Sequence, residues 1–186
     1  LDALFLKAQE TGFGGGKTID AFAGLENVYN HGNQPSLHIS WLFNFSGAPW
    51  LTQKWVRQIC DEFYGIDGIH GYGYGQDEDQ GQLGAWYVMA GMGLFDVKGG
   101  SDVEPNLQLG MPLFQKVRIR LHPDYYSGKE FVIEVKGDPT KQHYIRSASL
   151  NGNPHTSFQL PWNEFIQGGH LMLKASDKPN KRWGIE

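Results

Sequence analysis

Three consecutive acids, Asp77, Glu78 and Asp79, are the residues of this sequence with the clearest potential for chemistry. They lie in a glycine-rich segment just before an apolar stretch that begins near Gln82. In an extended segment, residues two apart project to the same side, so Asp77 and Asp79 would face one way and Glu78 the other. Paired carboxylates can activate a water molecule or bind a divalent cation, because crowding raises the pKa of one acid and a metal neutralises both. A solvated acidic turn whose aspartates cap the following helix explains the same residues equally well.

A second polar segment covers residues 29–38 and combines imidazole and carboxamide side chains, among them His31, Asn33 and Gln34. These groups suit hydrogen bonding to a polyhydroxylated ligand, and carboxamide oxygens can also bind a metal. The alternative is structural, with Asn33 and Ser36 capping the next helix and His31 buried in the core. Flat aromatic rings near the two segments could stack on the apolar faces of sugars. These rings belong to Trp41, Trp50, Tyr72 and Tyr74.

Other kinds of site fit the sequence poorly. A zinc site is disfavoured because there is no His-Glu-x-x-His motif and Cys60 has no partner cysteine. Cys60 stands among apolar neighbours in an expected helix, which favours an inert core thiol. Residues 11–18 come close to a phosphate-binding loop, but Thr11 replaces the leading glycine and the preceding residues favour a helix over a strand. We therefore expect an ordinary loop there and no nucleotide site.

The composition excludes several classes of protein. The 186 residues carry 16 lysines and arginines against 20 acids, and the net charge of −4 is not gathered into runs of one sign. An electrostatic nucleic-acid binder is therefore excluded. Hydrophobic residues make up 40% of the chain, which also excludes a disordered polyelectrolyte. No window approaches the roughly 18 to 20 apolar residues of a membrane-spanning helix, and a single cysteine leaves the redox compartment open.

The elements that must position the two polar segments are expected to be helices. A helical segment should follow Pro35, and an amphipathic helix should cover residues 50–64, with Pro49 suited to its first turn. Residues 82–94 are apolar nearly all round, so the helix that they predict needs burial on every side. These helices cannot enclose it by themselves. Either this chain docks against another domain, or it is the carboxyl-terminal portion of a longer protein.

Beyond residue 99 the hydrophobic period changes to two. Apolar and polar residues alternate over 117–121 and 131–136, which predicts antiparallel strands. Further strands are expected at 144–150 and 170–175, with a hairpin turn at Asn151-Gly152. We therefore expect an α+β chain with two parts, a helical part over residues 1–98 and an antiparallel β-sandwich-like part over residues 99–186.

Several motifs in the same order resemble those of glycoside hydrolase family 92, the calcium-dependent inverting α-mannosidases. Residues 29–36 resemble the family's HGNEPS-type segment, residues 49–54 its PWKTQ helix start, and residues 75–87 its GDEDNGQMSAWY segment. The likeness covers roughly residues 20–184. Later stretches that agree with the family are 110–114, 150–152 and 179–184.

The resemblance implies an (α/α) barrel preceded by an amino-terminal β-domain, of which this chain would carry the last barrel helices and the closing β-rich part. It implies that Asp77 and Asp79 are the catalytic carboxylates that activate water, and that Asn33 and Asp79 bind calcium. His31, Asn33 and Gln34 would contact substrate, a mannose-containing glycan. The general acid would come from barrel segments upstream of His31, so the chain would need the rest of its enzyme. The location implied is the bacterial periplasm, the cell surface or the exterior.

Two positions depart from the family pattern. Gln34 stands where many members have glutamate, and Leu37 where many have histidine. A neutral amide at Gln34 removes a charge from the pocket, which leaves the linkage specificity open. Two other functions stay open beside the mannosidase. One is a non-catalytic carbohydrate-binding module, in which the β-rich part binds glycans and the acidic residues are structural, and the other is a nucleotide-binding domain.

Overall fold

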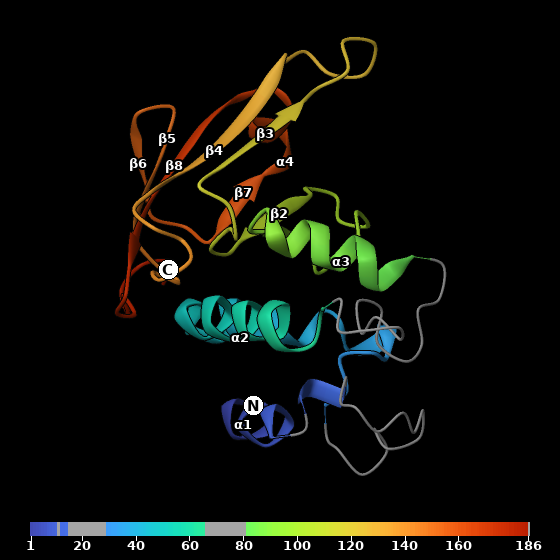
Figure 1. Cartoon of the computed structure of the whole chain (residues 1–186). Helices are drawn as coiled ribbons and strands as arrows, with labels where there is room; N and C mark the ends of the chain where they lie inside the picture. The colour runs from blue at the N-terminus through green and yellow to red at the C-terminus, as the bar shows by residue number, and fades with distance from the viewer. Residues whose placement is uncertain (11, 15–28, 66–80, 186) are drawn as a thin grey trace.

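The computed structural model describes residues 1–10, 12–14, 29–65 and 81–185. In the first half, the helices α1 (Asp2–Gln9), α2 (Pro49–Glu62) and α3 (Gln82–Gly91) lie one above another with α2 in the middle (Figure 1). Short 3-10 helices lie between α1 and α2 along the chain: η1 (Gly12–Gly14), η3 (Gln34–Ser36) and η4 (Ile39–Ser46). The strands of the second half lie at the top of Figure 1.

Helix α2 confirms the amphipathic helix predicted for residues 50–64, although it ends at Glu62. Pro49 stands in the first turn, where its fixed φ suits a helix and its missing N–H costs nothing. The apolar face, with Trp55, Val56 and Ile59, is buried as the three/four spacing predicts. This helix is the centre of the helical core.

The helical segment expected after Pro35 is present as two 3-10 helices, η3 and η4, which are tighter than an α-helix. The second ends at Gly47, whose φ of 73° lies in the left-handed region that glycine adopts without strain. Within η4, Trp41 is fully buried, and its ring stacks on that of Phe95 with 5.3 Å between the ring centroids. Trp41 of this segment therefore packs against Phe95, the residue that ends the first strand of the smaller sheet.

Helix α3 is shorter than the predicted 82–94, because Leu94 and Phe95 form the first strand, β1 (Leu94–Phe95). Leu83, Trp86 and Ala90 are buried, but Val88 on the opposite face is 59% exposed. Within the described ranges, this apolar helix is thus covered on one face only. No helix in those ranges has the length and hydropathy needed to span a membrane.

The second half contains a three-stranded and a five-stranded sheet. The smaller sheet has the order β1-β2-β7, with β2 at Asn106–Leu109 and β7 at Gln159–Pro161. The larger sheet has the order β3-β4-β8-β5-β6. Its strands, in chain order, are β3 (Lys116–Arg120), β4 (Glu130–Lys136), β5 (Tyr144–Leu150), β6 (Asn153–His155) and β8 (Gly169–Ser176). The two strands predicted from alternation and the two further strands expected at 144–150 and 170–175 are all present in this sheet.

One feature of the predicted antiparallel arrangement is wrong, because β4 and β8 pair in parallel. The chain reaches β8 through β7 and a short helix, α4 (Trp162–Ile166), and so enters the sheet in the direction of β4. Parallel neighbours need a crossover of this kind, whereas the hairpin of β5 and β6 needs only the turn Asn151-Gly152. The whole is an α+β fold with a mixed larger sheet.

Two apolar clusters form the interior. One belongs to the helices and 3-10 segments from Phe5 to Ala90, and the other is built by side chains of both sheets and of α4, from Leu94 to Trp183. Contacts from α2 join the two, since the Gln53 side-chain oxygen accepts from the Ile145 N–H at 2.9 Å. The boundary predicted between residues 98 and 99 remains a prediction.

Candidate functional site

The predicted site residues divide into two groups. Asp77 and Asp79 lie outside the described residues, so their proposed chemistry remains a prediction. His31, Asn33 and Gln34 are described, and they lie at and just before η3. The geometry below therefore concerns the segment of residues 29–36 and the helix ends around it.

His31 is buried with no exposed surface, and tyrosine hydroxyls contact both of its ring nitrogens. Nδ1 lies 2.9 Å from the Tyr29 hydroxyl, and Nε2 lies 2.9 Å from the Tyr64 hydroxyl. The Tyr64 hydroxyl donates its hydrogen to the Leu83 carbonyl at 3.0 Å, so it must accept from Nε2–H. The Tyr29 hydroxyl must then donate to the bare Nδ1, which defines one tautomer of His31.

The surroundings of the His31 ring are aromatic. Trp86, Phe63 and Tyr64 meet it edge-on, with ring centroids at 4.3, 4.8 and 5.5 Å. Burial lowers the pKa of His31 to about 3, because the charged imidazolium loses its hydration there. His31 is thus neutral at ordinary pH, and its contacts match the alternative of a core histidine with both nitrogens satisfied. Its direct contact with substrate remains a prediction.

Asn33 and Gln34 lie on the surface side of the same turn. The turn forms because the Asn30 side-chain oxygen accepts from the Gly32 N–H at 2.9 Å and the His31 N–H donates to the Phe13 carbonyl at 2.8 Å. Asn33 occupies the N-cap position of η3, but its side chain makes no capping hydrogen bond. The capping role considered from the sequence is therefore absent at Asn33, and its exposed carboxamide is accessible to a ligand.

The described residues bring together few of the donors that a metal site needs. In residues 1–10, 12–14, 29–65 and 81–185, no three His, Cys, Asp or Glu side chains gather in a way that could hold a metal ion. The exposed carboxamide oxygen of Asn33 is a donor of the kind that calcium accepts. This part of the donor set fits the predicted calcium site, which also requires Asp79.

Sequence reasoning missed the partners of His31. Tyr64 follows α2 and Trp86 lies on α3, so only the folded chain brings them to residue 31. The Trp86 indole N–H also donates to the Leu37 carbonyl at 2.9 Å, which fixes the residues after η3 against α3. Trp86 lies inside the motif at residues 75–87, whereas Tyr64 lies in none of the motifs and has no such sequence signal.

An apolar groove of about 250 Å³ runs beside this cluster along the open face of α3. Its lining is almost free of polar groups, so the groove suits a packed side chain better than a sugar. The residues that line it are Leu37, Gln82, Ala85, Trp86, Met89 and Phe95.

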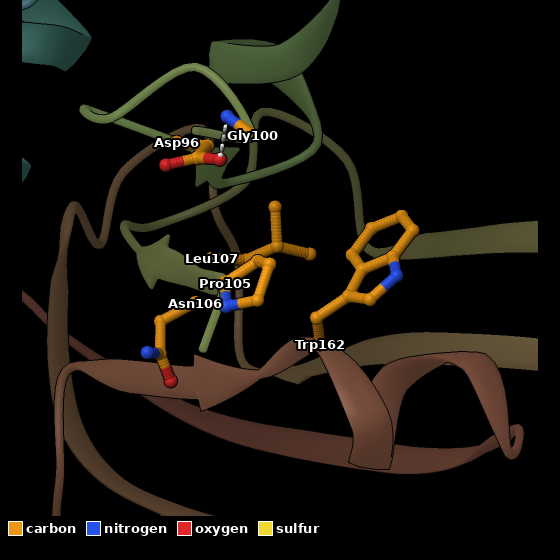
Figure 2. A pocket seen from close by; sticks show the side chains of 6 residues that line it. All are labelled: Asp96, Gly100, Pro105, Asn106, Leu107 and Trp162. Carbon is orange, nitrogen blue, oxygen red and sulfur yellow. Dashed lines mark hydrogen bonds between the residues drawn. The ribbon is translucent and has the colours of Figure 1, made fainter. Parts of the chain in front are cut away.

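A pocket of about 380 Å³ lies away from these residues, between the loop after β1 and the start of α4 (Figure 2). Trp162 forms one wall, and Asp96 lies at the other end with its carboxylate bonded to the Gly100 N–H at 2.6 Å. Asp96 also accepts from the Lys98 N–H at 2.9 Å, so its carboxylate serves the local turn. None of the described site residues lines this pocket.

Comparison with solved structures gives clear relatives. An inverting mannosidase of family GH92 from Bacteroides thetaiotaomicron is 32% identical, with a TM-score of 0.75 over 100% of this chain and 26% of its own. A family GH92 alpha-mannosidase from the same organism is 27% identical, with a TM-score of 0.76 over 99% of this chain and 23% of its own. The fold described above is therefore shared with a defined part of these enzymes.

Sequence comparison agrees. An uncharacterized secreted glycosidase of Arthroderma benhamiae is 29% identical over 163 residues, which are 85% of this chain and 19% of that protein. The chain thus spans roughly a fifth to a quarter of the length of these relatives. The family model for the glycosyl hydrolase family 92 catalytic domain matches residues 1–177. With helices, sheets and the segment around Asn33 all inside that match, the chain belongs to glycosyl hydrolase family 92.

Proposed function

We propose that this chain is the carboxyl-terminal part of an exo-acting α-mannosidase that hydrolyses α-mannosidic linkages with inversion. The match of residues 1–177 to a glycosidase catalytic domain carries the proposal. Two solved relatives support the substrate, since one is described as an alpha-mannosidase and another as an inverting mannosidase. The match includes the helical part as well as the sheets, which favours an enzyme over a non-catalytic carbohydrate-binding module.

In this proposal, Asp77 and Asp79 provide the base. An inverting glycosidase places a carboxylate base and a carboxylic acid on opposite faces of the sugar, roughly 6.5 to 9.5 Å apart, so that a water molecule fits beside the base. The base removes a proton from this water as the water oxygen attacks the anomeric carbon. The bond to the leaving oxygen breaks, and the acid gives that oxygen a proton. The acid would come from the remainder of the polypeptide.

Asn33 and Gln34 would bind the sugar beside this base. Their carboxamides can donate to and accept from hydroxyl groups, and Asn33 is exposed on the turn above His31. Asn33 and Asp79 would hold calcium, which when bound supplies a positive charge that attracts sugar hydroxyls. Gln34 is neutral where a glutamate is common, so it would bind hydroxyls without adding charge to the pocket.

The exposed face of α3 would be covered by the rest of the enzyme. We place α2 and α3 among the last helices of an (α/α) barrel, with another helix of the same polypeptide on the groove beside Trp86 and Met89. The relatives come from a bacterium and a fungus, and the fungal one is named as secreted. We therefore propose a location in the periplasm, at the cell surface or outside the cell.

The test is Asp79→Ala in the longest polypeptide that contains this chain. We expect mannose release from an α-linked mannobiose to fall by at least about 100-fold, because general base catalysis contributes roughly 10² to 10⁴ in rate. Asp124→Ala removes an exposed carboxylate in the β-rich part and should leave the rate unchanged. Unchanged turnover in Asp79→Ala would overturn the assignment of the base. Proton NMR of the first product tests the stereochemistry, since an inverting reaction on an α-mannoside releases β-mannose.

A further inference from the structure

A chain of buried and part-buried hydrogen bonds joins four segments of the helical part. It runs from the Tyr29 hydroxyl through both nitrogens of His31 to the Tyr64 hydroxyl, and ends on the Leu83 carbonyl. The backbone N–H of His31 adds a bond to the Phe13 carbonyl at 2.8 Å. We call the side chains of Tyr29, His31 and Tyr64 the imidazole clamp. The clamp therefore connects the turn before η3, the end of α2 and the start of α3, and the backbone of His31 adds the connection to η1.

The last hydrogen bond of the chain, from Tyr64 to Leu83, joins two residues that border the acidic segment in the sequence. Tyr64 comes two residues after the end of α2, and Leu83 is the second residue of α3. The stretch of chain between them carries Asp77 and Asp79. The bond from the Tyr64 hydroxyl to the Leu83 carbonyl therefore fixes the separation of the two points from which that stretch departs and to which it returns.

His31, the central residue of the clamp, also holds the turn that carries Asn33, the other part of the proposed site. His31 is two residues before Asn33, and its ring and backbone N–H are both bonded in the interior. One side chain thus fixes the turn that presents Asn33 and the ends of the stretch that carries the acids. A network of this kind has one low-energy arrangement, because hydrogen bonds are directional and every buried polar group must keep its partner.

We propose that His31 and Tyr64 are positioning residues for the proposed hydrolysis, holding the Asn33 turn and the ends of the acidic segment at one separation. The inference rests on the proposed function. Packing alone does not require these hydroxyl and imidazole groups, since apolar rings of similar size would fill the same aromatic cluster without the cost of burying polar groups. What the polar groups add is a defined distance between segments.

The variant Tyr64→Phe isolates this role. It keeps a ring to stack on Trp86, at 5.8 Å and 10° between planes in the native protein, and removes the hydroxyl that joins His31 to Leu83. Tyr87→Phe is the matched control. Its ring packs against Tyr64 at 4.6 Å, and its hydroxyl makes no hydrogen bond within the described residues.

The experiment measures kcat, KM and melting temperature in the longest polypeptide that contains this chain, with an α-linked mannobiose and with rates expressed per natively folded molecule. Loss of a residue that orients a reacting group typically costs about 10- to 100-fold. We expect kcat of Tyr64→Phe to fall in that range with KM within about threefold of the original. Tyr87→Phe should match the original protein. A second variant, Tyr29→Phe, leaves the Tyr64–Leu83 bond intact and should reduce kcat less.

Three results would decide against parts of this scheme. If Tyr64→Phe lowers only the melting temperature and keeps the original kcat per folded molecule, the clamp is structural and the inference is overturned. The same holds if Tyr87→Phe loses as much kcat as Tyr64→Phe, or if Tyr64→Phe does not fold and Tyr29→Phe keeps the original kcat. If the original protein releases no mannose at all, the proposed function fails instead.

Discussion

At the scale of single residues, His31 and Cys60 are both buried titratable groups, and burial moves their pKa values in opposite directions. The pKa of the Cys60 thiol rises to about 12 and that of His31 falls to about 3, because in each case the charged form loses its hydration. Both side chains are therefore held neutral. The sequence predicts this for Cys60 from its apolar helical neighbours. For His31 it leaves binding and burial open, since the tyrosines that satisfy the ring come from distant positions.

Burial of His31 predicts a loss of stability in mild acid. The unfolded chain binds a proton at this histidine below about pH 6.5, whereas the native protein does so only near pH 3. Between these values the unfolded state holds the extra proton, so the free energy of unfolding falls as pH falls, by up to about 1.4 kcal/mol per pH unit.

Urea unfolding of the original protein and of His31→Gln, between pH 7 and pH 4, measures this contribution. His31→Gln should be less stable at pH 7 and show a shallower pH dependence. His122→Gln, which removes an exposed histidine of the β-rich part, is the control variant. Equal slopes for His31→Gln and the original protein would show that His31 takes up its proton in the native state as well.

At the scale of elements, the sequence predicts those with a long, regular pattern. Strands β3, β4 and β8 follow the period of two, and α2 follows the helical spacing with Pro49 at its start. Strand β5 departs from this period, because its pairing with β8 shifts register between Ile145 and Ser147. The short strands β1, β2, β6 and β7 have two to four residues each, too few for a periodic signal. The parallel pairing of β4 with β8 depends on the crossover through α4, and a local pattern carries no information about such a connection.

The junction before β4 makes a prediction about packing. A side chain at Gly128 would overlap the backbone at Gln167 and Gly168, in the connection between α4 and β8. The Gly128 N–H also donates to the Ile166 carbonyl at 3.0 Å, so neither segment can move away without losing this bond. We expect Gly128→Ala to lower the free energy of unfolding by about 1 to 3 kcal/mol, the usual cost of overpacking.

Chemical denaturation checks this value against Gly65→Ala. An added Cβ at Gly65 meets no atom of the described residues within 4 Å, so this variant should change stability little. A Gly128→Ala protein as stable as Gly65→Ala would mean that the connection before β8 can shift at little cost.

At the scale of the whole molecule, the family could be predicted from ordered motifs, but the segment that covers the exposed face of α3 could not. Motif order constrains identity because several segments must agree at once, and the match to residues 1–177 confirms that prediction. The apolar pattern of residues 82–94 also indicates that α3 needs cover, and the described residues cover one face only. The apolar pattern of α3 does not identify the segment that covers its other face.

That uncovered face gives a testable expectation. In the longest polypeptide that contains this chain, Val88→Glu should lower the melting temperature, because a buried unpaired carboxylate costs several kcal/mol unless it is neutralised. Val103→Glu is the control, since Val103 is 97% exposed and lies in the loop before β2. Thermal unfolding of the two variants compares them, and a Val88→Glu protein as stable as Val103→Glu would mean that α3 faces solvent in the complete protein.

Helix α2 has contacts in both directions. Its Gln53 accepts from Ile145 in β5, and its Arg57 donates to the Pro139 carbonyl in the loop before β5 at 2.8 Å, while its carboxyl end leads into Tyr64. Helix α2 therefore contacts the larger sheet and leads into Tyr64, one residue of the imidazole clamp. Under the proposed function, a substitution that shifts β5 or its preceding loop would also shift α2 and Tyr64. Substitutions that lower the rate of hydrolysis should therefore map to β5 and this loop as well as to the site residues.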